Sequence, residues 1–308
     1  MLGRFAVAWL SRARCVQPVR YEDCPPLQPY QHVKQGTPTM GGLLLLAVGC
    51  VMAVGSGGLQ HRAGWLVFLA VVALAAVGLV DDLLKLRGAN ALGLRGGPKL
   101  AVALAEAGLV GAGASAGTPD GRLVDVPWIS QTLDLGWGWI PFAMLVVAGC
   151  AHAVNLADGM DGLAVGCTAI ALATLGVFAL TDPRHQVLVP WCASLAGACV
   201  GFLWLNGFPA AVFLGDVGAL GLGAALGAVG LVSGLSLWLL IIGGVFVMEA
   251  LSVILQVASY KWRDQRRIFR VAPLHHHFQV GGMSEPRVIV RFWIAGLLLA
   301  VLSLTGLG

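Results

Sequence analysis

One stretch decides the fold class: Gly-Trp-Leu-Val-Phe-Leu-Ala-Val-Val-Ala-Leu-Ala-Ala-Val-Gly-Leu-Val-Asp-Asp (64–82), an apolar run that ends in two carboxylates. A helix that crosses a bilayer needs roughly 20 mostly apolar residues, so this run predicts a span at 64–84. Further spans are predicted near 39–58, 98–116, 138–156, 163–180, 186–205, 217–233, 236–260 and 288–307. The chain of 308 residues is 58% hydrophobic and 11% charged, whereas soluble domains carry about 25% charged residues. The sequence therefore predicts a single all-α polytopic membrane domain over 1–308.

A further apolar segment, at 1–12, is too short to cross a membrane alone. We interpret it as a shortened first span, which makes about ten transmembrane helices. The segment 117–137 contains Pro, Gly and the alternating run Leu-Val-Asp-Val (123–126). Such a pattern between two spans predicts a short hairpin, which we place on the periplasmic side.

The basic residues are distributed unevenly between the two faces. Most of the 19 lysines and arginines lie on the face that comprises 12–37, 85–97, 157–162, 206–216 and 261–287, with the adjoining helix ends. Cytoplasmic loops carry an excess of such residues, so we expect this face of the multi-pass protein to be cytoplasmic. The net charge of +4 needs no nucleic-acid partner, and none is predicted.

Five aspartates lie on the same predicted face. Asp81 and Asp82 end a span, Asp158 and Asp161 are spaced i, i+3 and share a helix face, and Asp216 opens a span. Each also has a structural interpretation: a helix end for Asp81 and Asp82, a polar turn for Asp158 and Asp161, and an N-cap for Asp216. Carboxylates near hydrocarbon are costly and mark functional sites, and Mg²⁺ prefers a few carboxylates with water and phosphate oxygens. Together they predict a divalent-cation site for a phosphate-bearing substrate, with Asp216 a strong metal-ligand candidate.

Three consecutive histidines, His275, His276 and His277, lie in the basic segment 261–287. A zinc site is possible, although three adjacent residues cannot easily ligate one ion. The imidazoles could instead bind phosphate or carry protons, and the neighbouring arginines attract anions. A basic loop on anionic lipid is the alternative, but it explains the histidines poorly. A weaker signal for phosphate is the glycine-rich segment 36–42, which follows Lys34 and opens a span.

An ion-coupled transporter is the alternative from another class, because intramembrane carboxylates also mark ion pathways. Transporters usually place such groups near the bilayer midplane and within repeated halves. Here the aspartates lie at one face and the sequence shows no repeat, which favours an enzyme. Glu106 and Glu249 lie inside predicted spans, and we interpret both as structural.

Seven motifs follow one another along the chain. They are Gly-Thr-Pro-Thr-Met-Gly-Gly (36–42), Asp-Asp (81–82), Asn-Leu-Ala-Asp-Gly-Met-Asp-Gly-Leu-Ala (155–164), Val-Phe-Leu-Gly-Asp-Val-Gly (212–218), Glu-Ala-Leu-Ser-Val-Ile-Leu-Gln-Val (249–257), Pro-Leu-His-His-His-Phe (273–278) and Glu-Pro-Arg-Val-Ile-Val-Arg-Phe-Trp-Ile (285–294). On these motifs the chain resembles the phospho-N-acetylmuramoyl-pentapeptide transferases, a branch of the polyprenyl-phosphate sugar-phosphate transferases. A sister enzyme that uses UDP-GlcNAc is the alternative, against which the triple histidine speaks.

The resemblance implies transfer of phospho-MurNAc-pentapeptide from UDP-MurNAc-pentapeptide to undecaprenyl phosphate, which yields lipid I and UMP in peptidoglycan synthesis. It also implies ten spans, a homodimer, a magnesium-dependent cytoplasmic cleft, and a ninth helix that bends and protrudes beside a lipid groove. By position it makes catalytic residues of Asp81, Asp82, Asp216, His275 and His276, with Mg²⁺ on Asp216. It assigns substrate binding to Lys34, Lys99, Asn155, Asp158, Asp161, Asn206, Gln256 and His277. We expect direct attack with Asp81 as proton acceptor; a double displacement through Asp82 is the mechanistic alternative.

Overall fold

The computed structural model describes residues 16, 25–28, 30, 34, 36–87, 93–116, 119–129 and 131–307; the segment 1–12, with its predicted shortened span, lies outside them. The helices are α3 (Gly42–Gly55), α4 (Arg62–Leu86), α5 (Gly96–Ser115), α6 (Trp139–Ala157), α7 (Leu163–Thr181), α8 (Val189–Asn206), α9 (Gly215–Val232), α10 (Leu239–Ile242), α11 (Gly244–Trp262), α12 (Leu274–Val280) and α13 (Glu285–Leu304). Short 3-10 turns are η1 (Pro25–Leu27), η2 (Pro119–Arg122), η3 (Gly136–Gly138) and η4 (Gln186–Leu188). Two short strands are β1 (Leu123–Asp125) and β2 (Thr132–Asp134).

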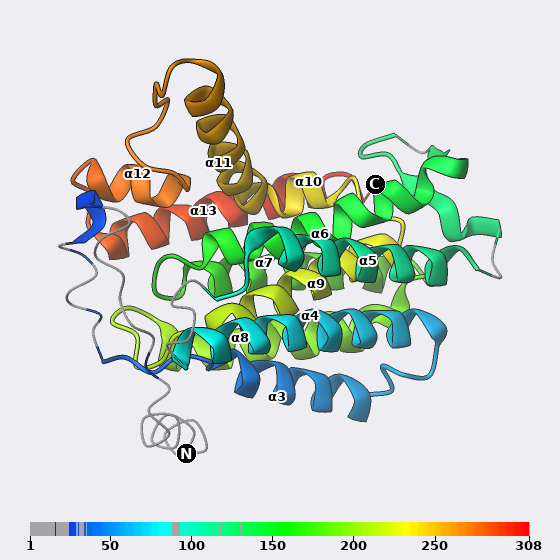
Figure 1. Ribbon diagram of the computed structural model, residues 1–308. Coiled ribbons are helices and arrows are strands. Elements are labelled where there is room, and N and C mark those ends of the chain that lie inside the picture. The colour runs from blue at the N-terminus through cyan, green and yellow to red at the C-terminus, as the bar shows by residue number, and fades with distance from the viewer. Residues whose placement is uncertain are drawn as a thin grey trace.

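The predicted spans correspond to helices that run side by side across Figure 1. In the described part of the chain, seven helices are long and apolar enough to cross a membrane, and α3 is a shorter apolar helix. A polytopic all-α membrane protein is therefore confirmed, whereas the count of ten spans stays a prediction. The predicted span at 236–260 is not one helix: it breaks at Gly243, which ends α10 and precedes α11. Beyond this break α11 stands out from the rest of the molecule (Figure 1).

Helix α9 lies at the centre of the bundle and packs mainly against α4 and α6. Small residues allow this close approach: a Cβ atom added to Gly78 of α4 would lie 2.6 Å from the Cα of Val217, and one added to Gly223 of α9 would lie 2.5 Å from the Cα of Ala151. Every residue of α9 is buried except Asp216 and Val232. The helix that fills the core therefore exposes Asp216 at its first turn.

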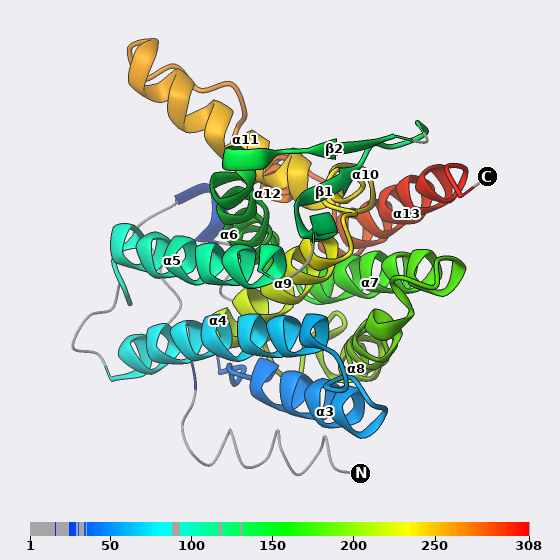
Figure 2. The ribbon, with the colours of Figure 1, turned by 90° about the vertical axis from the view of Figure 1, so that its right-hand side faces the viewer.

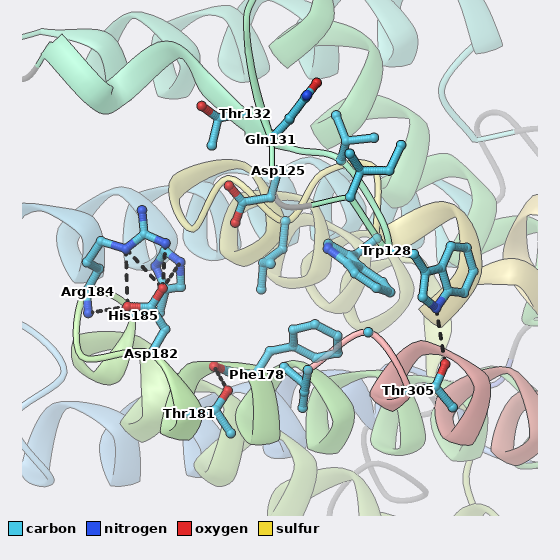
Figure 3. A pocket seen from close by; sticks show the side chains of 16 residues that line it. Asp125, Trp128, Gln131, Thr132, Phe178, Thr181, Asp182, Arg184, His185 and Thr305 are labelled. Carbon is cyan, nitrogen blue, oxygen red and sulfur yellow. Dashed lines mark hydrogen bonds and ion pairs between the residues drawn. The ribbon is translucent and has the colours of Figure 1, made fainter.

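Within the segment 117–137, β1 pairs antiparallel with β2 through Leu123–Asp134, Val124–Leu133 and Asp125–Thr132. Figure 2 shows these strands on the side of the bundle toward which the C-terminal end of α13 points. A cavity of about 420 Å³ lies beneath them, lined also by the ends of α7 and α13. Figure 3 shows its polar wall, where Arg184 pairs with Asp182 at 2.6 Å. Since α7 begins beside Asp161 and ends at Thr181, this cavity and the aspartates lie at opposite ends of the bundle.

Candidate active site

Three aspartates and two lysines meet where the end of α4 reaches the start of α9. Lys85 Nζ lies 2.6 Å from Asp81 Oδ2 and 3.1 Å from Asp216 Oδ1. Lys99, from the first turn of α5, pairs with Asp216 and lies 3.6 Å from Asp81 Oδ2. Asp81 and Asp82 are buried, whereas the Asp216 side chain is 18% exposed. Two cations thus bridge two of the carboxylates, and Asp216 offers the more accessible oxygens.

Asp82 has different partners, because its oxygens face the N-terminus of α9. Oδ1 accepts the backbone N–H of Asp216 at 3.2 Å, and Oδ2 accepts that of Val217 at 3.1 Å. The first N–H groups of a helix have no partner within the helix, and a carboxylate there also opposes the helix dipole favourably. Asp82 therefore anchors the turn that carries Asp216.

Gly215 makes this anchoring possible. Its φ is +76°, a left-handed conformation that favours glycine. A Cβ atom at this position would also lie 2.7 Å from Asp82 Oδ2. The Gly-Asp pair 215–216 is thus a geometric requirement of the contact between α4 and α9.

The turn between α6 and α7 brings a second group of predicted residues to the same end. Lys34 Nζ lies 2.7 Å from Asp161 Oδ1 and 2.5 Å from Glu285 Oε1. Asp161 Oδ2 accepts the N–H of Ala210 at 2.9 Å. Asp158 lies in this turn, and burial raises its pKa well above the ordinary value, with Asp216 and Asp82 contributing. The turn therefore brings a further carboxyl group, that of Asp158, close to Asp82 and Asp216.

Two asparagines frame this turn. Asn206 Oδ1 accepts the N–H of Gly162 at 3.1 Å, and its Nδ2 donates to the carbonyl of Val212 at 2.9 Å. Asn206 thus ties the turn to the segment that precedes α9. The Nδ2 atom of Asn155 is buried and has no hydrogen-bond partner among the described residues. Asn155 is therefore the member of this pair with free hydrogen-bonding capacity.

The histidines lie on α12, which packs against α11 and α13. The His275 ring is fully buried, and Nδ1 lies 3.1 Å from Oε1 of the equally buried Glu249. The His276 ring contacts it at a tilt of 57°, with ring centroids 4.1 Å apart, and burial together with His275 lowers the pKa of His276 to about 3. A Cβ atom at Gly159 would lie 2.3 Å from His275 Nε2 and 3.0 Å from His276 Nε2. The predicted histidines and the Asp158 turn are therefore adjacent.

Gln256 and His277 contact the loop between α11 and α12. Gln256 Oε1 accepts the N–H groups of Ile268 and Phe269 at 3.0 and 2.9 Å, and Nε2 donates to the Phe269 carbonyl at 3.0 Å. His277 Nδ1 accepts the N–H of Arg270 at 3.1 Å. These contacts hold the loop, while a role in substrate binding stays a prediction for both residues.

The carboxylate cluster fits a divalent cation by its chemistry. Asp81, Asp82 and Asp216 each offer an oxygen, and these atoms lie within 4.8 Å of one another. Hard cations such as Mg²⁺ take oxygen ligands and need only one or two carboxylates beside phosphate. Both Asp82 oxygens accept backbone N–H groups and Asp81 is buried, whereas the Asp216 side chain is 18% exposed, so Asp216 is the most accessible carboxylate of the three.

Comparisons with known proteins decide the family. Residues 64–234 match the model of glycosyl transferase family 4, and residues 34–46 match the phospho-N-acetylmuramoyl-pentapeptide-transferase signature 1. The chain is 41% identical over 316 residues to the phospho-N-acetylmuramoyl-pentapeptide-transferase of Thermodesulfovibrio yellowstonii, covering 97% of this chain and 86% of that protein. It is 40% identical to the protein of the same name from Methylacidiphilum infernorum, covering 100% of this chain and 89% of that one. The chain belongs to the phospho-N-acetylmuramoyl-pentapeptide-transferase family.

The sequence motifs gave no site role to Lys85 or Glu285 and left Glu249 with a structural one, yet each of the three contacts a predicted site residue. Lys85 pairs with Asp81 and Asp216, Glu285 pairs with Lys34, and Glu249 contacts His275. The spacing i, i+4 between Asp81 and Lys85 is a local signal that could have predicted the first pair. Glu285 and Glu249 meet partners more than 25 positions away, for which the single sequence holds no such signal.

Proposed function

We propose that this protein transfers phospho-MurNAc-pentapeptide from UDP-MurNAc-pentapeptide to undecaprenyl phosphate, which yields lipid I and UMP for peptidoglycan synthesis. The observation that carries the proposal is the full-length similarity to transferases of that name. The cluster of aspartates and lysines at one end of the bundle suits this reaction, because phosphoryl transfer depends chiefly on positioning and on neutralising phosphate charge. We place this end on the cytoplasmic side of the bacterial inner membrane, where the basic residues gather.

In the proposed site, Asp216 would hold Mg²⁺, which when bound would neutralise charge on the diphosphate of the sugar nucleotide. Lys85 and Lys99 contact Asp81 and Asp216. An arriving phosphate would compete for both ammonium groups and thereby loosen their hold on Asp81 Oδ2. Asp81 then accepts the proton of undecaprenyl phosphate, whose oxygen attacks the β-phosphorus. The bond from that phosphorus to the bridging oxygen breaks, and UMP leaves.

An apolar cavity supports a lipid substrate. It measures about 350 Å³ and lies between α6, α9 and α11, with Phe142, Gly149, Leu226 and Phe246 among its lining residues. The break at Gly243 lies on its wall. Burial of apolar surface is the force that would hold a polyprenyl chain here. The same helix, α11, continues toward the loop that Gln256 anchors, so one element would link the lipid site to the phosphate end.

Other predicted residues complete the proposed nucleotide side. Asp158, Asp161 and Asn155 lie in or beside one turn, with Lys34 paired to Asp161. We propose that this turn binds the nucleotide and that α12 contacts the diphosphate or sugar. We also propose that the protein acts as a homodimer.

The experiment that tests the proposed function is UMP release by purified protein with undecaprenyl phosphate and Mg²⁺. UDP-MurNAc-pentapeptide and UDP-GlcNAc are supplied in parallel reactions, with Asp216→Asn as the inactive control. We expect release with the muramoyl substrate alone and none from the variant. Release with UDP-GlcNAc would instead assign the chain the sister reaction. No release with either substrate from folded protein would contradict the proposal.

A further inference from the structure

The cavity beneath the strands β1 and β2 has an aromatic wall and a charged wall. Three rings form the aromatic wall: the centroids of Trp128 and Trp238 lie 5.3 Å apart, and those of Phe178 and Trp238 lie 5.0 Å apart. The volume of about 420 Å³ falls within the range of ligand pockets, about 300–1,000 Å³, which combine apolar and aromatic walls with a few polar groups. The cavity therefore has the size and the lining of a site for a small ligand.

The charged wall carries more negative than positive charge. Asp182 is paired with Arg184, whose Nε and Nη2 atoms donate to Asp182 Oδ2 at 2.9 and 2.6 Å. Burial lowers the pKa of His185, so this ring is neutral near pH 7. Of the lining side chains that the structure describes, two are carboxylates and one is a permanent cation. The second carboxylate, that of Asp125, therefore leaves the wall with a net negative charge.

Asp125 is the carboxylate of this wall that lacks a partner. It ends β1, and its backbone N–H donates to the Gly234 carbonyl at 2.9 Å, which fixes its position. Among the described residues no hydrogen bond or ion pair involves its side chain, and Figure 3 shows its carboxylate outside the network that joins Asp182, Arg184 and His185. Burial raises the pKa of Asp125, because a half-buried carboxylate has lost water without gaining a donor. A cationic ligand would supply that donor.

Trp128 is held at the same cavity in an unfavourable backbone conformation. Its φ is +59°, in the left-handed region, where a bulky residue is an outlier. Its Nε1 atom donates to Thr305 Oγ1 at 3.1 Å, which ties the ring to the end of α13 (Figure 3), yet 52% of the residue remains exposed. Strained residues cluster at ligand clamps, and the face of a tryptophan ring attracts ammonium groups. Trp128 thus offers an accessible aromatic surface beside the unpaired carboxylate.

The cavity lies at the level at which two helices leave the membrane. Helix α7 ends at Thr181 and α13 ends at Leu304, and both are long and apolar enough to cross a bilayer. Thr181 and Thr305 line the cavity, and tryptophans are enriched at this depth, among the lipid headgroups. One turn earlier, α13 exposes Val301 and Leu302, an apolar surface against which acyl chains can lie. A lipid headgroup can therefore reach the cavity.

We propose that this cavity binds the primary ammonium group of an ethanolamine headgroup, with Asp125 as its counter-ion and Trp128 as its aromatic contact. The ammonium group donates to the carboxylate oxygens of Asp125, and its charge lies against the ring of Trp128. The site lies at the opposite end of the bundle from the aspartate cluster. Its ligand therefore takes no part in the transfer proposed above.

Native mass spectrometry of the full chain in detergent tests this site. The protein is titrated with phosphatidylethanolamine and, separately, with phosphatidylglycerol of the same acyl chains, which lacks the ammonium group. Lipids also attach to the apolar surface, so each Kd is compared between the native protein and Asp125→Asn. We expect the variant to lose about tenfold or more in affinity for phosphatidylethanolamine, because a hydrogen bond to a charged group is lost, and to bind phosphatidylglycerol as before. An unchanged affinity for phosphatidylethanolamine would overturn the proposal.

Matched variants of the same segment show whether the effect belongs to the cavity. Asp134→Asn removes an exposed carboxylate of β2 that does not line the cavity, and it should leave the affinity for phosphatidylethanolamine unchanged. Trp128→Leu should weaken this affinity about threefold, whereas Trp137→Leu, which removes a wholly exposed ring, should not. Equal losses within either pair would contradict a specific site.

Soluble glycerophosphoethanolamine distinguishes the two sources of the headgroup. Displacement of the lipid by this compound would show that the headgroup alone is bound, and lack of displacement would show that acyl chains contribute; dependence on Asp125 supports the ammonium site in both cases. If Asp125→Asn does not fold, thermal unfolding provides the test. Phosphatidylethanolamine should raise the Tm of the native protein more than phosphatidylglycerol does, and Trp128→Leu should lose this difference. Equal Tm shifts with both lipids would overturn the proposal, and none of these measurements depends on UMP release.

Discussion

Asp82 on α4 holds the backbone of Asp216 on α9, with its Oδ1 3.2 Å from the Asp216 nitrogen. The two residues are 134 positions apart in the chain, and both carboxylates belong to the same cluster. Asp82 uses its oxygens on backbone N–H groups, whereas Asp216 directs its oxygens to lysines. The two aspartates therefore have different roles: Asp82 positions the backbone that carries Asp216, and the Asp216 side chain contacts the lysines.

This relationship predicts that Asp82→Asn destabilises the protein as well as lowering activity. The amide NH₂ would face a backbone N–H of α9, and an unsatisfied buried group costs about 1–3 kcal/mol. Thermal unfolding in detergent should show a lower Tm than the native protein, with the exposed Asp264→Asn as control. An unchanged Tm would show that Asp82 does not anchor α9.

The same geometry predicts that no phosphosugar adduct forms on Asp82. A nucleophilic carboxylate needs a free oxygen directed at phosphorus, and both Asp82 oxygens accept helix N–H groups. Rapid quenching of the enzyme with radiolabelled UDP-MurNAc-pentapeptide, without the lipid acceptor, should leave the protein unlabelled. Label on the peptide that contains Asp82 would establish the double displacement instead.

Gly215→Ala should abolish most activity. An added Cβ would meet Asp82 Oδ2 at 2.7 Å and would hold a side chain at a φ of +76°, so the turn that carries Asp216 must shift. A displacement of about 1 Å at a catalytic group can cost about 100-fold in rate. UMP release measures the loss. Gly97→Ala is the matched control, because a Cβ there meets nothing within 4 Å, and the two variants should differ sharply.

Asp158→Asn should raise stability near neutral pH while lowering activity. Burial and the neighbouring carboxylates Asp216 and Asp82 raise the pKa of Asp158 in the folded protein, so ionised Asp158 is less favourable there than in the unfolded chain. Ionised Asp158 therefore destabilises the folded protein once the pH rises above the pKa that this residue has in the unfolded chain. The neutral amide of the Asn variant removes this destabilisation. Tm measured at pH 7 should increase relative to the native protein, and this gain should shrink at pH 4. A lower Tm at pH 7 would contradict this assignment.

Acid should destabilise the protein through His276. Its pKa falls from an ordinary value near 6.5 to about 3 in the folded state, so the unfolded chain binds a proton first as pH decreases. Stability is therefore lost between about pH 6.5 and pH 3. In His276→Gln the dependence of Tm on pH across this window should be weaker than in the native protein. An identical dependence would show that His276 remains free to protonate in the fold.

Hydropathy and segment length were enough to predict the apolar helices, their approximate ends, and the polar residues near those ends. Runs such as 64–82 are long enough to span hydrocarbon, where backbone groups must bond within the helix, so hydropathy and length leave few alternatives. The motifs predicted Asp81, Asp82 and Asp216, and the family resemblance added Lys99; the structure gathers all four at one end of the bundle.

The sequence does not show which of these residues are anchored by other elements and which keep accessible side-chain atoms, because this depends on contacts between helices. Asp82 and Asp216 have the same side chain, and so do His275, His276 and His277, so residue type alone does not show which partner each of them has. Their roles depend on partners from distant elements: the start of α9 for Asp82 and Glu249 on α11 for His275. The interruption at Gly243 was likewise settled by packing, because an apolar run of that length could equally form one continuous helix. Composition fixes the length and environment of a helix, but the contacts between helices determine what each polar group can do.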